Sequence, residues 1–285
     1  MTPLERIPLV LAKIVDAVEP LGHAHWSFTL GNGAAIPGRA RVEDGWLMLE
    51  TERHHTPPTR SAWATLTSNA GLDGGARFAL ASRGIGLVVR ADIALDPEVD
   101  VERRIIEASA GLTTAARGVL CASAPPTEVI EASPDLASRC RDTGWPVAPR
   151  GTRELTVDLG VPGAFCQAVV SARADGTIAT VAPLLESAVE SPPSEVGRRA
   201  VALLLLRLGG VVRLVRAAAA PDDPASLCLE VVHTHPTTVE LAHAFAALAV
   251  ACRLAAAEAV ALYHDEAVAR LYLQHRNDAV VPRAA

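Results

Sequence analysis

Hydrophobic positions along the chain follow two different periods, and the period switches at recognisable turn residues. From Leu4 to Val18, apolar residues lie three or four positions apart, which predicts one amphipathic helix. From Trp26 to Glu52, apolar and other residues alternate around Asp44-Gly45, which predicts strands joined by a hairpin turn. The pattern then predicts a short helix over about 59–70, strands over about 77–81 and 86–93, and a long helix after Asp96-Pro97.

The second half of the chain repeats this order of elements. Matching marks lie at offsets that only grow along the chain, which is expected for a tandem duplication with loop insertions. The offset is 131 for the Asp-Gly turn, 135 for the Pro-Pro and Gly-Gly pairs, and 139–140 for the last helix. The predicted elements are strands over 155–159, 165–171 and 178–185, a helix ending at Leu208, strands over 211–217 and 227–232, and a final helix over 237–273.

The predicted fold class is therefore α+β. We expect a tandem duplication of an α-β-β-β-α-β-β-α unit, each copy an antiparallel sheet with helices packed on one face. The copies are expected at residues 1–121 and 153–275. The Ser- and Pro-rich residues 122–152 are interpreted as a linker, in which a short helix after Ser133-Pro134 is left open, and residues 276–285 as a C-terminal tail.

Charge and composition narrow the classes of function. The formal net charge is −6 without a basic stripe, which argues against nucleic-acid binding, and Arg103-Arg104 is interpreted as part of a solvated helix face. The five cysteines are an odd number without C-x-x-C spacing, which argues against a disulfide framework or a zinc knuckle. Residues 244–262 are the longest hydrophobic stretch, but Arg253 and Glu258 interrupt it, so we expect a soluble helix and no membrane association. No signal peptide is recognised, and a cytoplasmic location is expected.

The nine histidines raise the question of a metal site. Residues two apart on a strand face the same side, so His233 and His235 could present two imidazoles together. The sequence has no H-E-x-x-H or related signature, however, and loop or strand-end histidines are the favoured interpretation. No bound metal is therefore predicted. The other histidines considered as ligands are His23, His25, His54 and His55.

Motifs for other chemistry are also missing from the sequence. There is no G-x-S-x-G elbow, and Gly74-Gly75 and Gly209-Gly210 each follow a predicted helix, which indicates caps and turns rather than phosphate loops. His243 and His264 are both interpreted as solvent-facing helix residues. We therefore expect no cofactor, no catalytic residues and no enzymatic activity. The alternative is a metal-dependent hydrolase or another enzyme that uses the clustered histidines.

Four segments mark a recognisable order of elements: the hairpin Val42–Leu49, the helix end Asn69-Ala70-Gly71, the segment Ala76–Leu80 and the strand Gly86–Ala91. This order resembles the type III secretion chaperone-like fold, also described as CesT/YbjN-like. The resemblance covers about residues 1–121 and again about 130–275. It implies a fold whose members are small acidic homodimers that hold an extended segment of a partner protein, with no catalytic residues. Two fused copies would then form a pseudo-dimer within one chain.

The expected function is that of a protein-interaction module with a protein partner of unknown identity. The partner surface is expected on the first hairpin and at the end of the last helix, which is longer than a domain of this size needs. Packing of that helix end within the chain is the favoured alternative for its apolar residues, and self-association into a homo-oligomer through the long helix is a third possibility. The predicted partner-binding residues are Trp46, Met48, Leu262, Tyr263, Leu271 and Tyr272.

Overall fold

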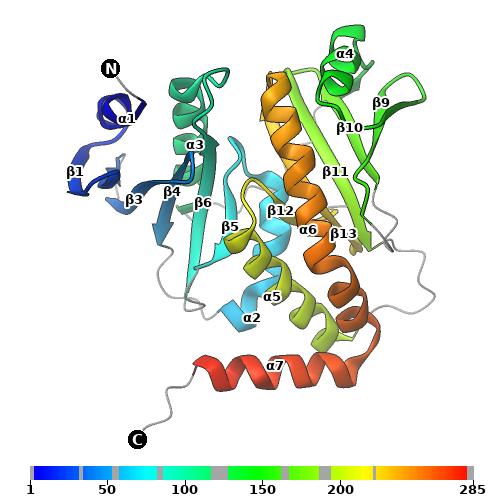
Figure 1. Cartoon of the computed structure of the whole chain (residues 1–285). Helices are drawn as coiled ribbons and strands as arrows, with labels where there is room; N and C mark the ends of the chain where they lie inside the picture. Colours follow the sequence, from blue (N-terminus) through cyan, green and yellow to red (C-terminus); the bar gives the residue numbers. More distant parts are fainter. Residues whose placement is uncertain are drawn as a thin grey trace, which may run out of the picture.

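A computed structural model describes residues 3–31, 35–52, 58–81, 86–116, 128–161, 167–185, 194–220 and 223–280. Within these ranges the chain forms two antiparallel sheets with helices, so the predicted α+β class is confirmed. The first sheet lies at the left of Figure 1 and the second at the right, with helices from both halves between them.

Among its described residues, the first half contains three α-helices, one short 3-10 helix and six strands. In chain order these are α1 (Pro3–Leu11), β1 (Ala17–Gly22), β2 (His25–Leu30), β3 (Ile36–Glu43), β4 (Trp46–Glu52), α2 (Pro58–Ser68), η1 (Asn69–Gly71), β5 (Arg77–Leu80), β6 (Leu87–Ala94) and α3 (Val101–Ala116). The last helix, α3, packs on β4, β5 and β6.

The second half contains seven strands and four helices among its described residues. They are β7 (Val129–Ile130), α4 (Pro134–Asp142), β8 (Val147–Arg150), β9 (Glu154–Asp158), β10 (Gln167–Arg173), β11 (Thr177–Leu185), α5 (Glu195–Val211), β12 (Arg216–Ala220), β13 (Asp223–Thr234), α6 (Thr238–His264) and α7 (Glu266–Val280). Helix α6 packs on β11 and β13.

The two sheets share one strand order. The first runs β1-β2-β3-β4-β6-β5, and the main path of the second runs β8-β9-β10-β11-β13-β12, with β7 added beside β10. In each half the middle helix, α2 or α5, follows the fourth strand of that path in the chain, β4 or β11, and precedes the last strand of the path, β5 or β12. On these main paths each half therefore has four described strands before its middle helix, and the expectation of three was wrong.

The additional strand of the first half, β1, replaces the end of the predicted first helix. Helix α1 ends at Leu11, and the amide of Asp16 donates a hydrogen bond of 3.0 Å to the carbonyl of Thr29 on β2. Apolar spacing continues past this point, but Val18 pairs with Phe28 as a strand residue. Pairing with a neighbouring strand thus overrides the local helical period.

The additional strand of the second half, β8, lies in residues that we interpreted as a linker. Residues 128–152 instead contribute β7, α4 and β8, and β8 pairs with β9 at the edge of the second sheet. The short helix left open after Ser133 is present as α4, with the Ser133 hydroxyl accepting a hydrogen bond from the amide of Leu136. The second half therefore begins well before residue 153.

The prediction of a single long helix over 237–273 is wrong, because the helix is interrupted at Asp265. Helix α6 ends there and α7 turns away beneath it (Figure 1). The Asp265 carboxylate accepts hydrogen bonds from the amides of Ala267 and Val268, at 2.9 and 3.1 Å. Aspartate is a strong N-cap, and this competes with continuation of the helix. Five residues of the predicted tail, 276–280, belong to α7.

Helix α5 runs through the middle of the molecule and contacts α2, α6, α7 and β5. Gly209-Gly210, predicted as the stop after this helix, lies inside its last turn. A Cβ atom on Gly210 would lie 2.2 Å from the carbonyl oxygen of Leu80 on β5, so the close approach of these elements requires glycine. One contiguous cluster of buried apolar side chains spans both halves as a result.

Helix α6 is long and apolar enough to cross a membrane by length and composition, and no other helix within the described ranges meets those criteria. One face of α6 is nevertheless buried against the second sheet and α5. The residues that form this inner face include Leu241, Phe245, Leu248, Cys252 and Leu262.

Candidate functional site

The most unusual feature of the molecule is a set of charged side chains buried between its two halves. They form three groups, which we name the Arg104 network, the Arg77 cluster and the Arg216 pair. Arg104, Arg77 and Arg216 are each at least 92% buried, although arginine is seldom buried without partners.

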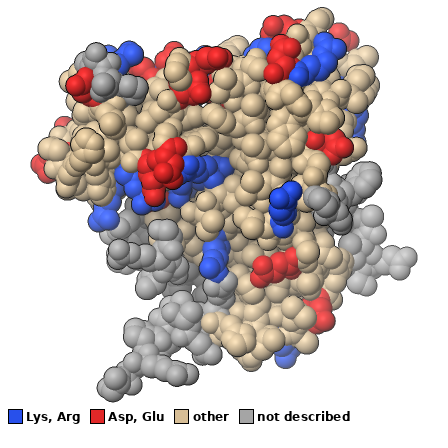
Figure 2. Space-filling view, in the orientation of Figure 1, with Lys and Arg blue, Asp and Glu red and all other residues tan. Residues whose placement is uncertain are grey.

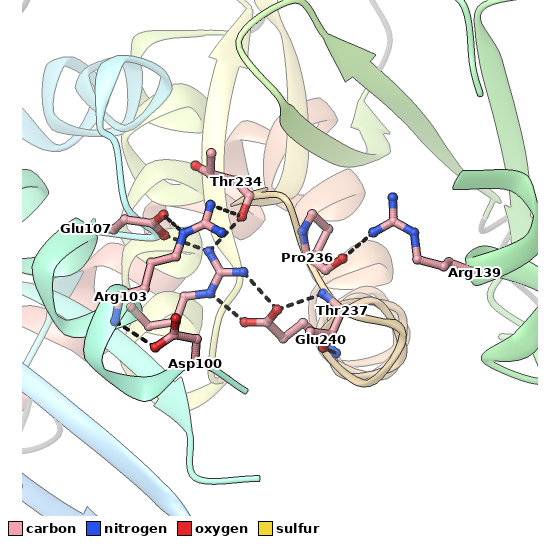
Figure 3. A network of polar contacts seen from close by, with 9 residues as sticks. Asp100, Arg103, Glu107, Arg139, Thr234, Pro236, Thr237 and Glu240 are labelled. Carbon is pink, nitrogen blue, oxygen red and sulfur yellow. Dashed lines mark hydrogen bonds and ion pairs between the residues drawn. The ribbon is translucent and has the colours of Figure 1, made fainter. Parts of the chain in front are cut away.

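The Arg104 network joins α3 of the first half to the start of α6 (Figure 3). The Arg104 guanidinium donates two hydrogen bonds to the Glu240 carboxylate, at 2.5 and 2.8 Å, which is the bidentate geometry that arginine and carboxylate favour. It also donates to Glu107, at 2.6 Å, and to the carbonyl of Thr234, at 3.0 Å. Arg103 donates to the same Thr234 carbonyl at 2.9 Å. The end of β13 and the first turn of α6 are therefore held by arginines 130 residues away in sequence.

Glu240 has a second role as part of a capping box. Its carboxylate accepts a hydrogen bond from the amide of Thr237 at 2.8 Å, and the Thr237 hydroxyl accepts one from the amide of Glu240 at 3.3 Å. Arg139 of α4 donates to the carbonyl of Pro236 on the other side of this turn (Figure 3). The turn that opens α6 is thus fixed from both halves of the chain.

These contacts set the ionisation of the network. Burial alone would raise the pKa of Glu240, but the hydrogen bonds from Arg104 and from the Thr237 amide lower it below its usual value. His233, on β13, loses solvation and feels the positive charge of Arg104, and together these lower its pKa to about 4. Around neutral pH, Glu240 is therefore ionised and His233 is neutral.

The Arg77 cluster lies on the first sheet and faces the end of α5. Arg77 and Arg90 both pair with Asp92, and the bond from Arg90 measures 2.8 Å. Arg77 also donates to the carbonyl of Gly209 at 2.8 Å, and Arg90 to that of Gly210 at 2.9 Å. The last carbonyls of a helix lack partners within the helix, and here the first half supplies them.

Asp92 compensates the charge of this cluster. Burial would raise its pKa, but the neighbouring charges of Arg77 and Arg90 hold the pKa below its usual value. Asp92 also accepts a hydrogen bond of 3.1 Å from the amide of Leu214, in the loop after α5. Burial lowers the pKa of Arg77 from its very high ordinary value, and the Asp92 charge opposes that shift.

The Arg216 pair is the counterpart on the second sheet. Arg216 donates to Glu230 at 2.8 Å and to the carbonyl of Leu72, just after η1. Asn69 adds a further link: its amide nitrogen donates to the carbonyl of Ala217 at 2.9 Å, and its amide oxygen accepts from the amide of Phe78 at 2.7 Å. Each half therefore caps the region where the middle helix of the other half ends, which is the last turn of α5 in one direction and the residue after η1 in the other.

A cavity of about 330 Å³ lies between α1 and the start of α3. Its apolar walls include Ile7 and Ile105, and its charged lining has one cation, Arg6, against three carboxylates. The three carboxylates are those of Asp96, Asp100 and Glu102.

The predicted partner-binding residues do not form one exposed surface. Met48 is buried and accepts a hydrogen bond from Arg90 at its Sδ atom, and Leu262 and Tyr263 are buried in the core, so the expectation of an exposed surface is wrong for these three. Tyr272 is half-buried, and only Leu271 is exposed.

Trp46, at the first hairpin, is half-buried between two residues of the second half. Its ring centroid lies 5.1 Å from that of His243 and 5.6 Å from the Arg213 guanidinium carbon. Trp46 and His243 thus face each other across the two halves, and His243 is not the fully solvent-facing residue that we predicted. Trp46 stabilises the contact between the halves rather than offering a free face.

Within the described residues, the histidines considered as metal ligands do not form part of a metal-binding cluster. His235 follows the end of β13 with a φ of 44°, so it does not share a strand face with His233. His23 and His25 flank Ala24 in the turn between β1 and β2. His54 and His55 lie outside the described residues. Among the residues that the structure describes, no group of three His, Cys, Asp or Glu side chains could hold a metal ion.

The buried arginines are the residues that sequence reasoning missed. Arg104 was interpreted as part of a solvated face, and this is wrong, because it is buried against Glu240. A signal was present at Arg77 and Arg216, since each opens an otherwise apolar strand, where a charge needs a buried partner. No family model matches the chain, and neither does any curated protein, so no function is transferred from a relative.

Proposed function

We propose that this chain is a non-enzymatic protein-interaction module of type III secretion chaperone-like character. In this proposal the halves are copies of one α+β unit that form an intramolecular pseudo-dimer and bind an extended segment of a partner protein. The observation that carries the proposal is the shared strand order of the two sheets together with the reciprocal contacts made by Arg77 and Arg216. Reciprocal contacts between like elements are typical of a two-fold interface.

The chemistry of the buried charges supports a scaffold. Asp92 and Glu240 are tied to arginines and have lowered pKa values, and His233 is held neutral near pH 7. General acid–base catalysis works best with groups whose pKa lies near the working pH. These groups instead keep one charge state and hold helix ends and turns in place.

The open edge of the first sheet offers a place for an extended segment. Strand β1 pairs only with β2 among the described strands, and its residues are exposed except for the half-buried Val18. An edge strand can accept a further strand through its main-chain hydrogen bonds. Pro20 lacks an amide hydrogen, so the added segment would pair mainly along Ala17–Glu19.

The cavity beside α1 indicates the chemistry of that segment. Helix α1 precedes β1 directly in the chain, so the cavity it lines belongs to the same end of the molecule. The apolar walls fit an apolar side chain. Glu102 already pairs with Lys13, but Asp96 and Asp100 still outnumber the one lining cation, Arg6, which favours a neighbouring Lys or Arg. We therefore propose an extended partner segment that combines apolar and basic residues.

The test uses the intact chain as bait in a native lysate, together with metal analysis of the purified protein. A polypeptide captured in stoichiometric amount should slow hydrogen exchange of the amides of Ala17–Gly22. Leu21→Arg changes an exposed residue of β1 and should reduce capture at least about tenfold. The matched control is Ile130→Arg, which changes an exposed residue of β7 in the second half and should leave capture intact.

The opposite result would be a stoichiometric metal ion without a bound polypeptide. It would overturn the proposal and favour the hydrolase alternative. A captured partner that leaves the hydrogen exchange of the β1 amides unchanged would support an interaction module. It would overturn the assignment of β1 as the binding edge.

A further inference from the structure

The outward face of α6 is apolar although it faces solvent. Val250 and Leu254 expose 50% and 55% of their surface, and Ala257 and Ala261 are exposed beside them. The opposite face of the same helix is buried in the core, so α6 is apolar on both sides. A helix of that kind is normally covered on both sides. The surface in front of α6 is largely uncharged in Figure 2.

The exposed residues form one narrow stripe. At about 100° per residue, Val250, Leu254, Ala257 and Ala261 fall within an arc of about 60°. Their spacing of four, three and four residues is the a/d spacing of a two-stranded coiled coil, with Leu254 and Ala261 at a, and Val250 and Ala257 at d. The break at Asp265 limits the seam to about two heptads.

Two opposite charges flank this stripe on its two sides. Arg253 lies about 60° to one side of Val250 and Glu258 about 80° to the other side. Neither forms an ion pair with another residue that the structure describes, and both side chains are exposed. Glu258 lies close enough to Tyr272 of α7 that, together with the larger effect of burial, it raises the pKa of that phenol to about 12.

We propose that this face of α6 binds a second copy of the chain, with the two α6 helices parallel across a two-fold axis. Leu254 and Val250 would meet the same residues of the second copy, and the alanines would permit close approach. Arg253 occupies a g position and Glu258 the following e position, so each Arg253 would face Glu258 of the second copy. In an antiparallel pair, g faces g, and Arg253 would meet Arg253.

This surface is independent of the edge strand β1 and of any partner polypeptide. The inference therefore does not rest on the proposed function, and either one can fail while the other stands. It also gives the second copy a defined orientation, which makes it testable in the purified protein alone.

Sedimentation velocity of the purified chain over a concentration series tests the association. We expect a species of twice 29.8 kDa that dissociates on dilution. Leu254→Glu should weaken the dimer by about a hundredfold or more, because two apolar side chains leave the seam. Leu271→Glu, which changes an exposed residue of α7, is the matched control and should leave the dimer unchanged.

Swapping the two charges by mutation distinguishes this seam from a non-specific apolar contact. Arg253→Glu and Glu258→Arg, each alone, should weaken the dimer by placing like charges together, and the double variant should restore it. Orientation follows from disulfide formation in single cysteine variants at 250, 254 and 261, with the unaltered chain as control. All three should crosslink in a parallel pair, whereas an antiparallel pair brings at most one of these positions next to itself.

Three results would overturn the proposal. One is a chain that stays monomeric at all concentrations, and another is a dimer that Leu254→Glu leaves unchanged. The third is a monomer that sediments with phosphatidylcholine vesicles and loses this binding in Leu254→Glu, which would assign the face to lipid instead.

Discussion

The two halves of the molecule place an arginine at the same position and neutralise it differently. Arg77 opens β5 and Arg216 opens β12, and each donates to a carbonyl near the end of the middle helix of the other half. In the second half the register partner of Arg216 is Glu230, which supplies the counter-charge directly. In the first half the register partner of Arg77 is a second arginine, Arg90, and the counter-charge comes from Asp92, two residues further on.

This difference shows that the position of the arginine matters more than the position of its counter-ion. The carbonyls at the ends of η1 and α5 need donors, and an arginine at the start of the edge strand reaches them. The carboxylate only has to lie within reach of the guanidinium. It can therefore lie opposite the arginine or two residues further along the neighbouring strand. The stability of the first half should therefore be more sensitive to loss of the one carboxylate buried in the Arg77 cluster.

The largest loss of stability is expected for Asp92→Asn. It leaves Arg77 and Arg90 buried without a full counter-charge, and we expect a loss of about 3–5 kcal/mol in the free energy of unfolding. Denaturant titration followed by circular dichroism measures it. Glu50 lies 3.5 Å from Arg90 and is partly exposed, so Glu50→Gln is the control and should cost about 1 kcal/mol or less.

Acidification tests a position where the halves differ in polarity. By strand register, His233 of the second half corresponds to the apolar Ile93 of the first. The pKa of His233 is lowered from 6.5 to about 4, so the unfolded chain takes up a proton first as the pH falls. Stability should decline between about pH 6.5 and pH 4, by up to about 3 kcal/mol, and should not change through this group above that window.

The matched variant for this pH dependence is His233→Gln, which removes the titrating group and keeps a polar side chain of similar size. Its unfolding free energy should be nearly flat between about pH 6.5 and pH 5, above the range in which the carboxylates begin to titrate. An unaltered pH profile in this variant would mean that His233 does not carry the effect. The carboxylates with lowered pKa values, Asp92 and Glu240, act at lower pH, where they lose their stabilising charge on protonation.

A smaller effect is expected at the directly paired counterpart, Glu230→Gln. Only one arginine loses its counter-charge, and Arg216 keeps its hydrogen bond to the carbonyl of Leu72. We expect a loss of about 2 kcal/mol, clearly below that of Asp92→Asn. Equal losses in the two variants, measured by the same denaturant titration, would contradict the difference between the halves.

The smallest loss of stability is expected for Arg213→Ala, at the edge of the contact between the two halves. Its guanidinium lies over the Trp46 ring and 3.4 Å from the partly solvated carboxylate of Asp44, so its contribution is that of an exposed cation–π contact. A loss of about 0.5–1 kcal/mol is expected, with a change in Trp46 fluorescence. Arg213→Lys should keep part of the contact.

The sequence was sufficient for the elements that carry strong local signals. The Asp-Gly hairpins, the alternation of β2 to β4 and the stripe of α3 all depend on residues close together in the chain. The end of α1, the strand β8 and the break at Asp265 were missed because each depends on a competing local or tertiary hydrogen bond. Periodicity alone does not weigh such competition.

The buried charges were out of reach for a different reason. Arg104 and Glu240 are 136 residues apart, and each has ordinary helical neighbours in sequence. Their meeting depends on how α3 and the start of α6 are placed by the two sheets. The same holds for Trp46, whose hairpin looks exposed in the sequence but whose ring faces His243 of the second half.

The exchange of caps between the halves has a consequence for how the chain is made. Synthesis runs from the N-terminus, so Arg77, Arg90 and Asp92 leave the ribosome before the carbonyls of Gly209 and Gly210 exist. Until then the charged cluster of the first half lacks these two carbonyl acceptors. Its folding therefore finishes only after α5 has been translated, and a stalled ribosome before that point would hold an incomplete first half.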